Sequence, residues 1–139
     1  MELLVDIEIN LKFTLTNGFK ISDSKDFGMA QLCVLEYPIL KIEIWKDRFD
    51  YNAIMNYNEE KYNVIHLANF LNNKEIKYMF CDFEFKTREI DAKRFLQQLD
   101  KIIEDEFDKI LEFLFTLSPE KQTDFNKYCE KTNANLRGW

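Results

Sequence analysis

Glycine and proline are scarce in this 139-residue chain, which contains three glycines and two prolines. Phosphate-binding loops of the GxGxxG and GxxxxGK[S/T] kinds, and nucleophile elbows of the GxSxG kind, need closely spaced glycines because the backbone must approach the ligand. Gly18, Gly28 and Gly138 are too far apart to form any of these motifs. The sequence therefore excludes glycine-rich nucleotide-binding loops and nucleophile elbows.

Histidine and cysteine are also few. His66 is the only histidine, and no serine, cysteine or carboxylate lies near it at helical spacing, so we expect a solvent-exposed histidine on a helix and no catalytic relay. The cysteines, Cys33, Cys81 and Cys129, are odd in number and include no CxxC pair. This pattern predicts buried, reduced thiols in a cytoplasmic protein, with no metal and no other cofactor.

A basic segment and a long apolar run are both missing. The 19 Lys and Arg residues are outnumbered by 25 Asp and Glu residues, which gives a formal net charge of −6. Such a charge repels phosphate backbones, so nucleic acid is not an expected partner. No run approaches the ~20 apolar residues of a membrane span, and the N-terminus has no basic region typical of a signal peptide.

What the chain does contain is material for a core, because 46% of its residues are hydrophobic and 15% are aromatic. No linker or repeat divides it, so we expect one domain over residues 1–139 with a loose tail at 132–139. Strict alternation of apolar and polar residues predicts strands. The Asn17–Gly18 turn indicates a short return strand. The expected strands cover residues 3–15, 19–21, 31–37, 39–46 and 76–86, with a loop at 22–26.

Helical spacing of apolar residues predicts three helices, over 59–72, 92–117 and 119–131. Asn58 is the expected N-cap of the first, and Ser118–Pro119 is a start signal for the last. Strands and helices occupy separate parts of the sequence. The predicted fold class is therefore α+β, with a mainly antiparallel sheet of about five strands.

Carboxylates are the one abundant group that could carry chemistry. Asp82 and Glu84 lie two residues apart on a predicted strand, so they share a face with about 6–7 Å between side chains. That arrangement permits an acid/base pair or a divalent cation, and hence a small hydrolase or metal-dependent enzyme, if another acid or His66 joins them. It is equally compatible with a protein-contact surface or with a plain solvated strand face.

Two other acidic regions are candidates for protein recognition. The segment 45–57, expected to connect a strand to a helix, combines aromatic residues with carboxylates, as binding hot spots do. Its candidate contact residues are Asp47, Asp50, Tyr51 and Tyr57, with both tyrosines expected at the surface. A stripe on the long helix is the competing candidate, and it contains Glu104, Asp105 and Asp108. Either region is also compatible with a solvated surface that binds nothing.

The order of elements from residue 83 onward resembles a known class of proteins. Phe83-Glu84-Phe85, then Ile90-Asp91, then Phe95-Leu96-Gln97-Gln98-Leu99 form a strand, a capped turn and an amphipathic helix. This unit is similar to the C-terminal half of small immunity proteins of bacterial contact-dependent and polymorphic toxin systems. The resemblance implies a stoichiometric inhibitor that binds its cognate toxin and occludes the active site, but it transfers no functional residue.

The sequence therefore favours a non-enzymatic protein-binding module, an immunity protein whose acidic, aromatic-containing surface meets a basic toxin domain. Two alternatives from other classes remain open. One is the carboxylate-dependent enzyme that uses Asp82 and Glu84. The other is a homo-oligomeric adaptor in which the long helix pairs with itself.

Overall fold

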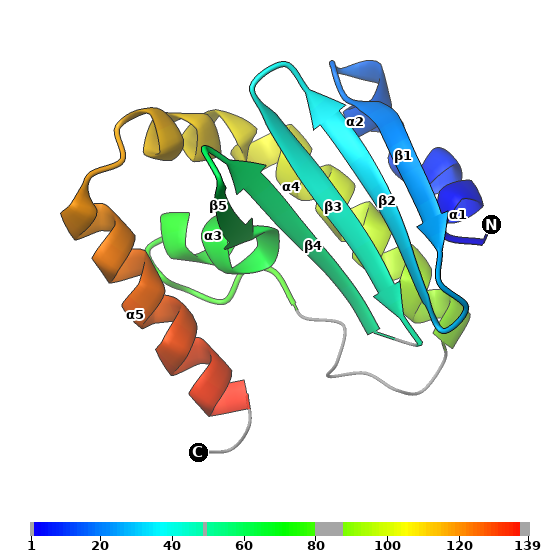
Figure 1. Ribbon diagram of the computed structural model, residues 1–139. Coiled ribbons are helices and arrows are strands. Elements are labelled where there is room, and N and C mark those ends of the chain that lie inside the picture. The colour runs from blue at the N-terminus through cyan, green and yellow to red at the C-terminus, as the bar shows by residue number, and fades with distance from the viewer. Residues whose placement is uncertain (1, 49, 80–87, 137–139) are drawn as a thin grey trace.

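The computed structural model describes residues 2–48, 50–79 and 88–136. For residues 88–92 and 134–136 it describes the backbone alone. Its centre is an antiparallel five-stranded sheet in which each strand pairs with the next one along the chain, in the order β1-β2-β3-β4-β5. Helices pack on one face of this sheet (Figure 1). The predicted α+β class with an antiparallel sheet is confirmed.

The five strands are short and are joined mostly by tight turns. Two of them match the predicted strands at 31–37 and 39–46 closely. β1 is longer than the return strand expected at 19–21, because residues 22–26 continue it instead of forming a loop. The strands are β1 (Lys20–Asp26), β2 (Ala30–Tyr37), β3 (Leu40–Asp47), β4 (Asp50–Tyr57) and β5 (Glu60–Asn63).

The N-terminal segment is helical, so the strand predicted over 3–15 is wrong. Residues form α1 (Glu2–Asn10) and α2 (Lys12–Thr16) instead. The reason lies in the pattern itself, because apolar residues at every second position also supply every fourth position. Leu3, Ile7 and Leu11 form that helical stripe and are fully buried. Val5 and Ile9, which a strand would have buried on the same face, are more than half exposed.

The segment between β3 and the first predicted helix also differs from expectation. Residues 50–57 form β4 and not a connecting loop, and Asn58 lies in the turn before β5 with φ of 49°. The helix expected over 59–72 is shorter, α3 (Val64–Leu71). Its N-cap is Asn63, whose side-chain oxygen accepts a hydrogen bond from the backbone N–H of His66 at 3.1 Å.

Two long helices complete the chain, as predicted. α4 (Arg88–Phe115) begins earlier than the expected 92–117, and α5 (Pro119–Leu136) continues past residue 131 into the tail that was expected to be loose. Residues 76–79 form no strand, and the rest of the strand predicted over 76–86 lies outside the described residues. Within the part of the chain that is described, no helix is long and apolar enough to span a membrane.

The core lies between the sheet and the helices that cover one of its faces. Ile42 and Ile44 of β3 and Met55 of β4 are fully buried there, together with Leu96 and Ile102 of α4. Figure 1 shows α4 and α1 behind the sheet, with the other face turned toward the viewer. We call that second side the outer face.

Candidate protein-binding surface

The outer face is defined by the residues that alternate with the core-facing ones. In register, Leu32 of β2 pairs with Trp45 of β3, and Trp45 pairs with Asn52 of β4. Trp45 is half-buried, although α4 lies on the opposite side of the sheet. A large aromatic side chain in the middle of a strand and away from the core has its ring available to a partner.

Two hairpin turns lie side by side at one end of this sheet. Ala30, which follows the β1–β2 turn, pairs with Asp47 before the β3–β4 turn. The backbone N–H of Arg48 donates to the carbonyl oxygen of Met29 at 2.9 Å, which joins the two turns. Gly28 supplies the positive φ of 89° that the first turn needs.

Apolar side chains are exposed where the two turns meet. Phe27 is 59% exposed and Met29 is 65% exposed. The Phe27 ring stacks on Trp45, with 6.1 Å between the ring centroids and an interplanar angle of 17°. Asp47 and Asp50 are exposed beside them, and Asp26 closes the first turn by accepting the Gly28 N–H at 2.8 Å. We define the hairpin-tip surface as Asp26, Phe27, Met29, Trp45, Asp47 and Asp50.

Glu43 holds the indole of Trp45 in place. Its carboxylate accepts hydrogen bonds from Trp45 Nε1 at 3.1 Å, from Lys61 Nζ at 3.2 Å and from the side-chain amide of Asn56. Burial by itself would raise the pKa of Glu43, but the hydrogen bonds from Asn56, Lys61 and Trp45 outweigh it and leave the pKa lowered. Trp45 is therefore fixed on one side by a hydrogen bond and on the other by the Phe27 ring.

The lowered pKa makes a prediction about acid stability. A carboxylate whose pKa is lowered in the folded state stabilises that state above its unfolded pKa, near 4.5, and this stabilisation is lost as the pH falls through the folded value. We expect Glu43→Gln to flatten the loss of unfolding free energy between neutral pH and acid conditions, measured by urea unfolding. Glu36→Gln, an exposed β2 control, is expected to unfold like the wild type, and an equal acid response in all three proteins would contradict the assignment.

Of the four contact residues predicted in segment 45–57, the two aspartates lie on the outer face of the sheet and the two tyrosines do not. Asp47 and Asp50 pair across the β3–β4 hairpin on the outer face, and neither has a cation within 4.0 Å among the described residues. Like charges directly opposite each other are destabilising, so this pair does not serve the sheet. Both carboxylates are exposed and can meet a partner's cation, since the neighbouring Lys46 is paired with Glu2 at 2.8 Å.

Tyr51 and Tyr57 point to the other side of the sheet. Tyr51 is only 9% exposed, and its ring lies 5.7 Å from that of Phe95 on α4, so the prediction of a surface position is wrong for this residue. Tyr57 is partly buried, with its ring 6.3 Å from that of Phe115. The alternation of a strand explains the outcome, because residues 51 and 57 share the parity of the core-facing Met55.

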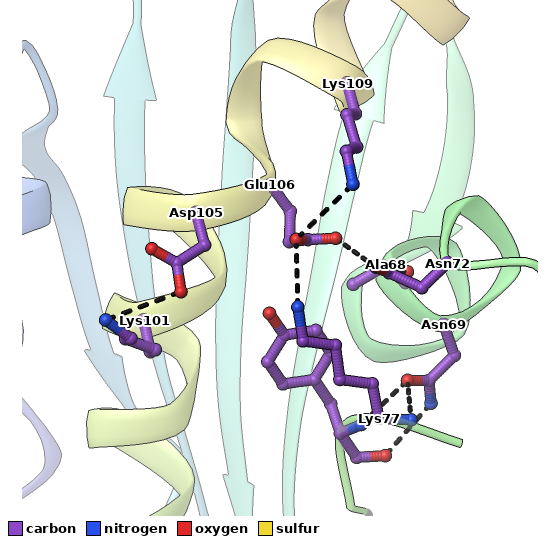
Figure 2. Close-up of polar contacts among 9 residues, drawn as sticks. Ala68, Asn69, Asn72, Lys77, Lys101, Asp105, Glu106 and Lys109 are labelled. Carbon is purple, nitrogen blue, oxygen red and sulfur yellow. Dashed lines mark hydrogen bonds and ion pairs between the residues drawn. The ribbon is translucent and has the colours of Figure 1, made fainter. Parts of the chain in front are cut away.

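The competing acidic stripe lies on the solvent side of α4. Glu104, Asp105 and Asp108 are exposed, while Ile103 and Ile110 of the same helix are buried. Lys101 partly neutralises the stripe, at 3.8 Å from Glu104 and 3.4 Å from Asp105, the latter contact drawn in Figure 2. Since α4 covers the inner side of the sheet, this stripe and the hairpin-tip surface are on opposite sides of the molecule and form two separate candidates.

The carboxylate pair of the enzyme hypothesis, Asp82 and Glu84, lies outside the described residues. That hypothesis and the self-pairing of the long helix stay predictions. Among the residues that the structure does describe, no three His, Cys, Asp or Glu side chains are grouped so that they could hold a metal ion.

His66 is buried, at 4% exposure, so the predicted solvent-exposed position is wrong. The cause is the surroundings of α3, which packs between α4 and α5 and has no wet face over residues 64–69. His66 Nε2 lies 3.2 Å from the side-chain oxygen of Asn133, and its ring meets Tyr128 edge-on at 6.2 Å. The imidazole therefore belongs to the contact between α3 and α5.

A buried carboxylate that the sequence analysis missed is Glu106 of α4, only 2% exposed (Figure 2). It accepts from the Asn72 side chain and lies 3.5 Å from Lys77 Nζ and 4.0 Å from Lys109 Nζ. Its position three residues after Ile103 and four before Ile110 was the available signal, because that spacing places it on the buried stripe. The cluster ties α4 to the end of α3 and to the segment that follows it.

The two described cysteines are poor nucleophiles. Burial raises the pKa of both the Cys33 and the Cys129 thiols to about 11, and neither forms a disulfide. At neutral pH both stay protonated, whereas the thiolate is the reactive form. Cys33 is buried as predicted, whereas Cys129 on α5 is only partly buried.

Comparisons with protein-family models, with curated proteins and with solved structures found no match for the chain.

Proposed function

We propose that this chain is a non-enzymatic protein-binding module and that the hairpin-tip surface is its contact with the partner. The observation that carries the proposal is the exposure of Phe27, which stacks on a hydrogen-bonded Trp45, and of Met29 in the neighbouring turn. Aromatic residues and methionine are enriched at protein interfaces, and a tryptophan that is already ordered loses little entropy on binding.

The charge around these apolar residues indicates what kind of partner would fit. Three exposed aspartates, Asp26, Asp47 and Asp50, belong to the hairpin-tip surface. Of the cations nearby, Lys25 is paired with Asp23 at 3.6 Å and Lys46 with Glu2 at 2.8 Å, and Arg48 lies in the second turn. The whole chain carries a formal charge of −6, so its long-range field adds to this local excess. Such a surface favours a cationic protein, because complementary charge accelerates encounter and selects partners.

The finer proposal is an immunity protein that occupies and blocks a basic toxin domain in the cytoplasm. It is supported by the resemblance of residues 83–99 to small bacterial immunity proteins and by the acidic, aromatic composition of the hairpin-tip surface. In this account the aspartates steer the toxin domain, and Phe27, Met29 and Trp45 are buried on contact and slow its release.

Differential capture from the organism that encodes the chain tests the proposal. Three immobilised proteins are compared: the wild type, the double variant Asp47→Lys and Asp50→Lys, and an α4 control with Glu104→Lys, Asp105→Lys and Asp108→Lys. We expect a basic protein to be retained by the wild type and the α4 control and lost by the hairpin-tip variant, as quantified by mass spectrometry. Retention by all three, or loss only with the α4 control, would place the interface elsewhere.

A further inference from the structure

A groove unrelated to the hairpin-tip surface lies between the segment that follows α3 and helix α5. It encloses about 440 Å³, within the range of roughly 300–1,000 Å³ found for small-ligand pockets. Lys74 and Ile76 form one wall. The other wall comes from one side of α5, where Lys127 and Lys131 lie one turn apart.

The groove is locally cationic in an acidic chain. Three lysines, Lys74, Lys127 and Lys131, line it together with a single carboxylate, Asp124. Among the described residues, none of the three ammonium groups has a carboxylate within 4.0 Å. Lys74 Nζ instead lies 5.6 Å from the centroid of the Phe70 ring. Three lysines against one aspartate leave a net positive charge along the groove, which favours an anion as its ligand.

Ile76, Tyr128 and Thr132 form the rest of the lining. The Tyr128 ring packs against Phe70 at 5.5 Å and meets His66 edge-on at 6.2 Å, so its position is fixed before any ligand arrives. Thr132 is 8% exposed at the bottom of the groove, and Ile76 is 64% exposed at its rim. The Tyr128 hydroxyl is itself buried, which raises its pKa, so the part of this residue that faces the groove is its partly exposed ring.

We propose that this groove binds a small organic anion, whose carboxylate or phosphate lies among Lys74, Lys127 and Lys131 while its apolar body rests on Tyr128 and Ile76. Both a fatty acid and a nucleoside monophosphate have this chemistry. The site is independent of the hairpin-tip surface, since its residues come from the α3–α5 side of the molecule.

The test uses the full chain and the fluorescent probe 8-anilinonaphthalene-1-sulfonate, which combines an anion with an apolar body. Titrations compare the wild type, the groove variant Lys127→Gln with Lys131→Gln, and a control with Lys12→Gln and Lys20→Gln, which removes the same charge from exposed positions elsewhere. We expect one-to-one binding by the wild type and the control, and about tenfold weaker binding by the groove variant. Circular dichroism verifies that all three are folded.

Displacement of the probe then separates the two ligand sources. Competition by octanoate supports a fatty acid, and competition by adenosine monophosphate supports a nucleotide. The proposal is overturned if the wild type shows no saturable binding, if the groove variant and the control bind equally well, or if neither competitor displaces the probe.

Discussion

Replacing Asn69 with alanine is expected to lower the free energy of unfolding by about 3 kcal/mol. Asn69 is fully buried in α3. Its side chain provides hydrogen-bond partners for the backbone of Lys77 and Tyr78, which lie in no helix or strand. Its oxygen accepts the backbone N–H groups of Lys77 and Tyr78 at 2.9 and 2.8 Å, and its amide donates to the Tyr78 carbonyl at 2.9 Å (Figure 2). Alanine would leave all three backbone groups without this partner, and the Tyr78 groups are buried.

Urea unfolding measures this effect, and Asn126→Ala provides the matched control. Asn126 is exposed on α5, and its side-chain oxygen accepts a hydrogen bond from Gln122 one turn earlier at 3.0 Å. We expect the control to change the unfolding free energy by less than about 0.5 kcal/mol. A similar, small change in both variants would mean that Asn69 does not hold the segment after α3.

Replacing Trp45 with alanine is expected to weaken the partner complex by about 100-fold, chiefly through faster dissociation. The indole is the largest apolar group of the hairpin-tip surface, and it is held by Glu43 and by Phe27 before binding. Its loss removes contact area and the ordering of Phe27 together. Surface plasmon resonance with the captured partner gives both rate constants.

A second variant separates lost binding from lost folding. Phe27→Ala removes a side chain that is 59% exposed, so it is expected to leave the fold intact and still raise the dissociation rate. Phe115→Ala is the matched control, because Phe115 is also 59% exposed but lies at the end of α4. Equal dissociation rates for the wild type, Phe27→Ala and Trp45→Ala would remove these aromatic residues from the interface.

The sequence predicted an element correctly where its apolar residues fit the repeat of a strand or the repeat of a helix, but not both. Leu40, Ile42 and Ile44 alternate with charged or aromatic residues, and only a strand places them on one face. The apolar residues of α1 fit both the strand repeat and the helix repeat, so the sequence pattern alone does not decide between them. Packing against the rest of the molecule favours the helix. β4 was missed because Ile54 on the outer face interrupts the alternation of Tyr51, Ala53 and Met55.

The candidate surface was predicted only in part, for a related reason. Asp47 and Asp50 were found from composition, since aromatic residues and carboxylates gather around them in the sequence. Phe27 and Met29 lie far from them along the chain. Only the register of β1, β2 and β3 brings Phe27 against Trp45 and Met29 beside the second turn. The pattern of residues within one segment does not give the register between strands. Phe27 and Met29 therefore could not be assigned to this surface from the sequence.

The most direct test of the proposed recognition is the association rate of the partner measured at low and at high ionic strength. If the aspartates of the hairpin tip steer a cationic partner, the wild-type rate falls as salt is added, because screening weakens attraction between exposed charges. The variant with Asp47→Lys and Asp50→Lys should then associate slowly and with little salt dependence, while reversal of Glu104, Asp105 and Asp108 leaves the wild-type behaviour. A hairpin-tip variant that keeps both the wild-type rate and its salt dependence would contradict this account.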